Sequence, residues 1–197
     1  MEYLFGEKKL AHNDSYLPFV TPHNVSETVI QQAQEHFDFS DKIVWDMFAG
    51  IGTDAIKFAD IANKVYCTEI NPETYHNLLE NTKGHENIIT YNGNCLDYLS
   101  DIKANIIYFD PPWGSTFKSG QNFDFNDVKI NDLTIPQLAI KLRNHAHLII
   151  KAPIPSNSFE EALGTDIDVF TFTKQKLNFH FCGGLAVPRD PLLNGAS

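Results

Sequence analysis

The sequence is poor in cysteine and in long apolar runs. Its three cysteines, Cys67, Cys95 and Cys182, lie far apart and form no Cys-x-x-Cys pair, which argues against a disulfide framework and against a zinc site. No apolar run reaches about 18 residues, so no membrane-spanning helix is expected. The N-terminal residues lack the apolar core of a secretion signal. These absences predict an intracellular protein of the nucleus or cytoplasm that holds no metal.

Positive charge is also scarce. The chain has 25 acidic residues against 15 lysines and arginines, which gives a formal net charge of -10. Non-specific affinity for nucleic acid comes from neutralising phosphates, so this balance argues against broad binding to a duplex. Recognition of one small nucleotide feature in a pocket stays compatible with it, provided that a local basic patch makes any RNA contact.

Short apolar strands alternate with helices from residue 42 onward. Strands are predicted at residues 42–46, 64–69, 87–91, 104–110 and 147–151. Helices are predicted at residues 54–61 and 71–83, after Thr134, at 156–163, and after an N-cap at Thr21. Residues 111–133 are predicted as a long loop, and 166–173 with 176–182 as a terminal hairpin. The pattern predicts an α/β fold with a doubly wound, mostly parallel seven-stranded sheet that an antiparallel hairpin closes.

Ligands of such sheets bind at the carboxyl ends of the strands. In this chain the first predicted strand leads into a glycine-bearing turn at that edge. The turn reads Asp-Met-Phe-Ala-Gly-Ile-Gly. Its backbone N–H groups suit the carboxylate of S-adenosylmethionine, and its aspartate suits the amine of the same molecule. A tight turn without a ligand is the alternative for this motif alone. The candidate cofactor-binding residues here are Asp46, Phe48, Gly50, Gly52 and Thr53.

Two further turns follow the next two predicted strands. Glu69 ends the second strand, where a carboxylate can accept hydrogen bonds from both ribose hydroxyls, and Ile70 follows it. Asn94, with Cys95 beside it, follows the third strand and can both donate to and accept from an adenine edge. An exposed strand-end acid and a polar turn kept for its conformation are the alternatives.

The most informative segment is Asp-Pro-Pro-Trp, residues 110–113, directly after the fourth predicted strand. An exocyclic amine of a nucleobase is a poor nucleophile because its lone pair is delocalised into the ring. A carboxylate at Asp110 and a carbonyl at Pro111 could accept both amine hydrogens, and Trp113 could stack on the base. A stiff Pro-Pro turn beside a packing tryptophan is the alternative. Asp110, Pro111 and Trp113 are therefore the candidate catalytic residues, with Asp110 also facing the cofactor.

The motifs together resemble the trimethylguanosine synthase family, the cap guanine N2-methyltransferases. The resemblance covers about residues 3–182 and rests on these segments: Phe19–Pro22, Asp46–Gly52, Glu69–Pro72, Gly93-Asn94, Asp110–Gly114 and Phe123–Phe125. It implies a methyltransferase sheet, S-adenosylmethionine as the cofactor with S-adenosylhomocysteine as the product, and Trp113 stacked on 7-methylguanine. It also implies that the segment 1–40 covers the site of a domain at 41–182, which a tail at 183–197 follows.

The resemblance implies capped RNA or a 7-methylguanosine nucleotide as the partner. We expect the chain to act as a monomer. Pro112 and Trp113 are then the base contacts, and Lys118 and Lys151 are the candidate phosphate contacts. The family has Asp where this chain has Asn94, and it has a basic residue after the proline that follows strand five, where this chain has Ile154. Lys151 could supply the positive charge of that missing basic residue.

Three other functions fit part of the pattern. A methyltransferase of adenine N6 or guanine N2 in tRNA, rRNA or DNA would share the same acceptor segment. A non-catalytic subunit would keep only the cofactor turns. An NAD enzyme would share the ribose-binding acid, although Ala55 replaces the third glycine of its fingerprint.

Overall fold

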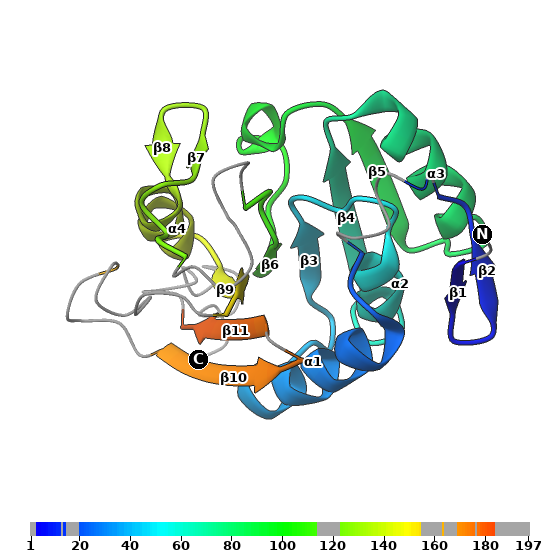
Figure 1. The fold of residues 1–197 in the computed structure, drawn as a ribbon, viewed down its shortest axis with the longest axis horizontal. Helices are drawn as coiled ribbons and strands as arrows, with labels where there is room; N and C mark the ends of the chain where they lie inside the picture. Colours follow the sequence, from blue (N-terminus) through cyan, green and yellow to red (C-terminus); the bar gives the residue numbers. More distant parts are fainter. Residues whose placement is uncertain are drawn as a thin grey trace, which may run out of the picture. The chain divides into compact units, whose positions relative to one another are not determined.

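The computed structural model describes residues 3–12, 14, 20–113, 123–154, 163, 169–175 and 177–183. The chain divides into two compact units, Met1–Ala104 and Asn105–Ser197 (Figure 1). Of the sequence expectations, Phe19, Gly114 and Lys118 lie outside the described residues, as do the predicted helix at 156–163 apart from Leu163 and the tail beyond Gly183.

A seven-stranded sheet has the order β10-β11-β9-β6-β3-β4-β5. The first unit contributes β3 (Ile43–Asp46), β4 (Lys64–Glu69) and β5 (Ile88–Asn92). The second contributes β6 (Ile106–Phe109), β9 (His147–Pro153), β10 (Val169–Lys174) and β11 (Leu177–Cys182). Pairing is parallel within β3-β4-β5 and between β6 and β9, and antiparallel among β9, β11 and β10. The predicted fold class, with its closing hairpin, is confirmed.

Local sequence chemistry sets the helices of the first unit, which are α1 (His23–His36), α2 (Thr53–Ala59) and α3 (Pro72–Thr82). The Asn71 side chain caps α3 by accepting the N–H groups of Glu73 and Thr74. The prediction that Thr21 caps α1 is wrong, because Pro22 is the cap residue and no side chain caps this helix. Thr21 instead directs its hydroxyl into a buried contact with α2.

The N-terminal residues form a hairpin that the sequence did not predict. Strands β1 (Tyr3–Phe5) and β2 (Lys8–Leu10) pair across a turn that contains Gly6 in the left-handed region. Phe5 and Leu10 are buried in a cluster with Ile51 and Ile56. Three-residue strands are too short to show periodicity, and only this packing reveals them.

The second unit contains one helix, α4 (Ile135–Arg143), in its described part. It begins after Thr134, as the sequence led us to expect, and Thr134 and Gln137 close a capping box there. The prediction of an uninterrupted loop over 111–133 is wrong. Strands β7 (Lys129–Ile130) and β8 (Leu133–Thr134) form a small hairpin there, and Phe125 is fully buried ahead of it. The two-residue strands are again too short for a sequence signal.

Candidate functional site

The turn after β3 is shaped by two glycines with positive φ. Gly50 has φ +54° and Gly52 has φ +92°, both in the left-handed region that L side chains avoid. A Cβ on Gly52 would lie 2.7 Å from Cδ1 of Leu78, so this residue also needs the missing side chain for space. Gly52 caps α2, whose first residue, Thr53, is buried, and Asp46 at the end of β3 is 1% exposed. The half-buried Phe48 completes the predicted turn.

Glu69, the last residue of β4, is held by backbone donors from two different turns. The N–H of Gly50 donates to its Oε2 at 3.0 Å, and the N–H of Asn71 donates to its Oε1 at 2.8 Å. Burial raises the pKa of Glu69, and the backbone hydrogen bonds oppose that rise. The carboxylate is therefore oriented before any ligand arrives, at the predicted ribose position.

The residue after Glu69 is the most exposed large apolar side chain of the described chain, with Ile70 67% exposed. Leaving an isoleucine in water at a strand end forgoes about 1.5–3 kcal/mol of burial, which a flat apolar ligand could recover. Ile70 thus offers an apolar contact beside the Glu69 carboxylate.

The turn after β5 is tied to the turn after β4. The Asn92 side-chain amide donates to the carbonyl of Glu69 at 2.7 Å, and the N–H of Gly93 donates to the same carbonyl at 3.0 Å. Asn94 caps the 3-10 helix η2 (Cys95–Tyr98) by accepting the N–H of Leu96 at 3.0 Å. Burial raises the pKa of the Cys95 thiol to about 12, so it is neutral. Asn94 therefore has a conformational role, and adenine recognition remains a prediction.

The residues of the first unit suit S-adenosylmethionine by their chemistry. The oriented, buried carboxylate of Glu69 could accept hydrogen bonds from two ribose hydroxyls. The glycine turn at the start of α2 has backbone N–H groups that could bind the cofactor's carboxylate. The Asp46 carboxylate could pair with the ammonium of the cofactor's amino-acid end. Among the described residues, no group of three or more His, Cys, Asp or Glu side chains could hold a metal ion. In the same part of the chain, every helix is too short or too polar to cross a membrane.

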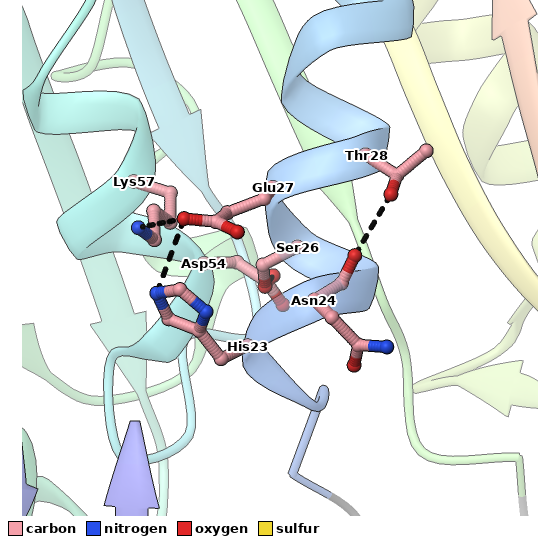
Figure 2. A network of polar contacts seen from close by, with 7 residues as sticks. All are labelled: His23, Asn24, Ser26, Glu27, Thr28, Asp54 and Lys57. Atoms are coloured by element: carbon pink, nitrogen blue, oxygen red, sulfur yellow. Dashed lines mark hydrogen bonds and ion pairs between the residues drawn. The ribbon is translucent and has the colours of Figure 1, made fainter. Parts of the chain in front are cut away.

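A polar network joins α1 to the start of α2 (Figure 2). Asp54, on the first turn of α2, accepts hydrogen bonds from the hydroxyls of Ser26 and Thr21, the latter at 2.6 Å, and all three residues are buried. Glu27 of α1 pairs with Lys57 of α2 at 3.1 Å and with His23 at 3.3 Å. Sequence reasoning missed this network, although an acid directly after Gly52-Thr53 was its visible signal. The network fixes the N-terminal helix against the glycine turn.

The predicted catalytic segment follows β6 in the second unit. Pro111 is buried, Pro112 is exposed, and Asp110 and Trp113 are half-buried. The Nζ of Lys151, on β9, donates to Oδ2 of Asp110 at 2.5 Å and lies 5.7 Å from the centroid of the Trp113 ring. Lys151 is 3% exposed. The structure thus brings together two predicted catalytic residues and a predicted phosphate contact, and it gives that buried lysine a half-buried acidic partner.

The second unit also contains an aromatic cluster. Phe123 and Phe125, which belong to the resemblance, are buried and pack edge to face at 5.1 Å. Phe125 also packs against His180 of β11 at 5.7 Å. Burial lowers the pKa of His180 to about 4, so this imidazole is neutral near pH 7. The Phe-Asp-Phe segment therefore contributes packing to the second unit.

Comparison with known sequences points to one family. A profile of the RNA cap guanine-N2 methyltransferase family matches residues 41–174, more than half of the chain. An uncharacterised protein of Acanthamoeba polyphaga mimivirus is 29% identical over 117 residues, or 56% of this chain. The chain spans about half the length of that curated relative, since the match covers 46% of it.

Solved structures share the fold at low sequence identity. A protein of Escherichia coli named as a methyltransferase aligns with a TM-score of 0.62 and 17% identity, over 89% of this chain and 90% of its own. An RNA methyltransferase of Salinibacter ruber, crystallised with S-adenosyl-L-homocysteine, aligns with a TM-score of 0.57 and 14% identity, over 87% and 97%. At these identities the likeness shows the fold, and the site residues of this chain rest on its own geometry.

Proposed function

Since the chain belongs to the RNA cap guanine-N2 methyltransferase family, and so to the S-adenosylmethionine-dependent methyltransferases, we propose that it methylates the 2-amino group of 7-methylguanosine in an RNA cap. The observation that carries the proposal is the Asp110 carboxylate at the end of β6, on a Pro-Pro-Trp segment and paired with a buried lysine. An exocyclic amine on a flat base requires a hydrogen-bond acceptor and a stacking surface, and Asp110 and Trp113, three positions apart, offer both.

The first unit would hold the cofactor. Glu69 would accept the ribose hydroxyls, Ile70 would contact the adenine, and the Gly50–Gly52 turn with Asp46 would receive the amino-acid end. S-adenosylmethionine supplies a methyl group as an electrophile on a sulfonium sulfur, and the electron pair of the broken C–S bond stays with S-adenosylhomocysteine.

The second unit would hold the base. Asp110 and the Pro111 carbonyl would accept the two amine hydrogens, which localises the nitrogen lone pair as the new N–C bond forms. Asp110 would then take the proton that the nitrogen must lose. Trp113 would stack on the base and set its plane, and a positively charged 7-methylguanine would add a cation–π contribution of about 0.5–2 kcal/mol.

The acidic net charge of -10 favours a small nucleotide feature over an extended duplex. A methyltransferase acting on adenine or guanine within tRNA, rRNA or DNA remains the second candidate. Its acceptor chemistry at Asp110 would be the same, and only the base would differ.

The test is methyl transfer to 7-methyl-GTP and to unmethylated GTP cap analogues, with the methylated nucleosides identified by mass spectrometry. The proposal expects 2-amino methylation of the 7-methyl analogue alone. Asp110→Ala should lower kcat by about 10²–10⁴-fold, as removal of an acid–base group does. The exposed Asp127 provides the matched control, Asp127→Ala, which should keep full activity. Methylation of adenine, or of GTP and 7-methyl-GTP alike, would contradict the cap assignment.

A further inference from the structure

Strand register places Lys151 next to Asp110. Strands β6 and β9 are parallel neighbours, and Phe109 is the register partner of Ile150. Asp110 directly follows Phe109 after the end of β6, and Lys151 follows Ile150 on β9. The two residues therefore come side by side, and the Lys151 ammonium lies 2.5 Å from Asp110 Oδ2. Neither residue alone signals this pairing, because 41 positions separate them in the sequence.

The surroundings of Lys151 make its charge costly without a partner. On β11 its register partner is Phe179, which is fully buried, and Lys151 itself is 3% exposed. Because side chains alternate across a strand, Tyr108 and His147 share the sheet face of Lys151, and His180 and Cys182 point to the other face. On these neighbouring strands, the carboxylate within reach of the ammonium is that of Asp110. A buried ammonium is retained where it has such a partner.

We propose that Lys151 is a positioning residue for the methyl-acceptor site: it keeps Asp110 as an oriented carboxylate and covers one face of the Trp113 indole, so that the base stacks on the opposite face. The inference rests on the proposed function, since it deepens the role of Asp110 as the acceptor of the amine hydrogens. A carboxylate accepts at both of its oxygens, so pairing Oδ2 with the ammonium is compatible with an amine at Oδ1. The ammonium also favours the anionic form that an acceptor needs.

This role differs from the phosphate contact that the sequence led us to expect. A lysine that touches a substrate phosphate acts mainly through substrate binding, so its loss raises KM. A lysine that orients the Asp110 carboxylate affects how the amine is held for methyl transfer, so its loss lowers kcat. The two roles therefore separate in steady-state kinetics.

The kinetic experiment compares Lys151→Met and Lys151→Arg with the exposed control Lys141→Met, on the nucleobase substrate that the wild type methylates. Lys151→Met should lower kcat about 100-fold with less than about a threefold change in KM. The acid limb of its pH–rate profile should move to higher pH, because the carboxylate loses the cation that favours ionisation. Lys151→Arg keeps the charge and should recover part of the rate and the original acid limb.

A second readout needs no turnover. Carboxyl ¹³C NMR follows the titration of Asp110, whose signal is identified by its loss in Asp110→Asn. The midpoint should move to higher pH by about one unit or more in Lys151→Met, and Lys141→Met should leave it in place.

Four outcomes would overturn the inference. An unchanged Asp110 midpoint in Lys151→Met would show that the pair does not control the carboxylate. Normal kcat with a raised KM would make Lys151 a substrate contact. An active wild type with an unaffected Lys151→Met variant would remove any role, while the proposed function would stand. If the wild type instead methylates no nucleobase substrate, the proposed function fails and the positioning role fails with it.

Discussion

Replacing Glu69 tests the cofactor half of the site most directly. The residue is 8% exposed, and its carboxylate accepts hydrogen bonds from the N–H groups of Gly50 and Asn71. These two donors fix the carboxylate in place, and the proposal adds two ribose hydroxyls to the same oxygens. Glu69→Ala therefore removes the ribose acceptors and also releases the anchor between the turn after β3 and the turn after β4.

The magnitude follows from the number of hydrogen bonds. A hydrogen bond to a charged group contributes about 1.5–3 kcal/mol, so two ribose contacts amount to about 3–6 kcal/mol. Some of this is recovered by water in the variant, and the lower end is the fair expectation. About 3 kcal/mol corresponds to a roughly 150-fold weaker affinity for S-adenosylhomocysteine.

The pH dependence gives the prediction a second signature. Burial raises the pKa of Glu69, so its carboxyl becomes protonated at a higher pH than an exposed glutamate does. A protonated carboxyl loses part of its acceptor capacity, and affinity should fall as the pH drops through that raised pKa. Above it, affinity should be independent of pH as far as this group is concerned.

The assay is calorimetric titration with S-adenosylhomocysteine at several pH values. The matched control is Glu73→Ala, since Glu73 is exposed on the first turn of α3, only four positions away. Circular dichroism of both variants checks that they are folded. A Glu69→Ala variant that binds within about threefold of the wild type would show that the ribose assignment is wrong.

Two further predictions concern stability. Asp54→Ala removes two buried hydrogen bonds, from Thr21 and Ser26. It should lower the free energy of unfolding by about 3 kcal/mol, which corresponds to a Tm lower by about 6–12 °C. Glu27→Gln, at the exposed ion pair with Lys57, should lower the free energy of unfolding by less than about 1 kcal/mol. Equal melting temperatures for the two variants would contradict this reading of the network. Burial lowers the pKa of His180 to about 4, and the unfolded chain takes up that proton near pH 6.5. The contribution of neutral His180 to the free energy of unfolding is therefore fully present above about pH 6.5. It is lost as the pH falls toward 4, by up to about 3 kcal/mol. Urea unfolding at pH 7 and pH 4.5 should show a smaller acid loss in His180→Gln, and an equal loss in both proteins would refute it.

Local chemistry explains which expectations held. The strand–helix alternation after residue 42 predicted the sheet, because buried strands and capped helices leave strong short-range signals such as Asn71-Pro72 and Thr134-Ile-Pro136. The expectations that failed lacked such signals. The hairpin β1-β2 and the hairpin β7-β8 have strands of two or three residues, and their stability comes from packing that no local pattern encodes.

The candidate site divides in the same way. By itself the sequence determined the turn chemistry, because the glycines at 50 and 52, the acid at 69 and the segment Asp110–Trp113 each stand at the end of a strand or within a few residues after it. Only the tertiary structure decided what these groups touch. Glu69 meets Gly50 across 19 positions, Asp54 meets Ser26 across 28, and Lys151 meets Asp110 across 41. Such partners are fixed by strand register and helix packing, which act between segments far apart in the chain. Lys151, which the sequence offered as a candidate phosphate contact, is therefore a buried partner of Asp110.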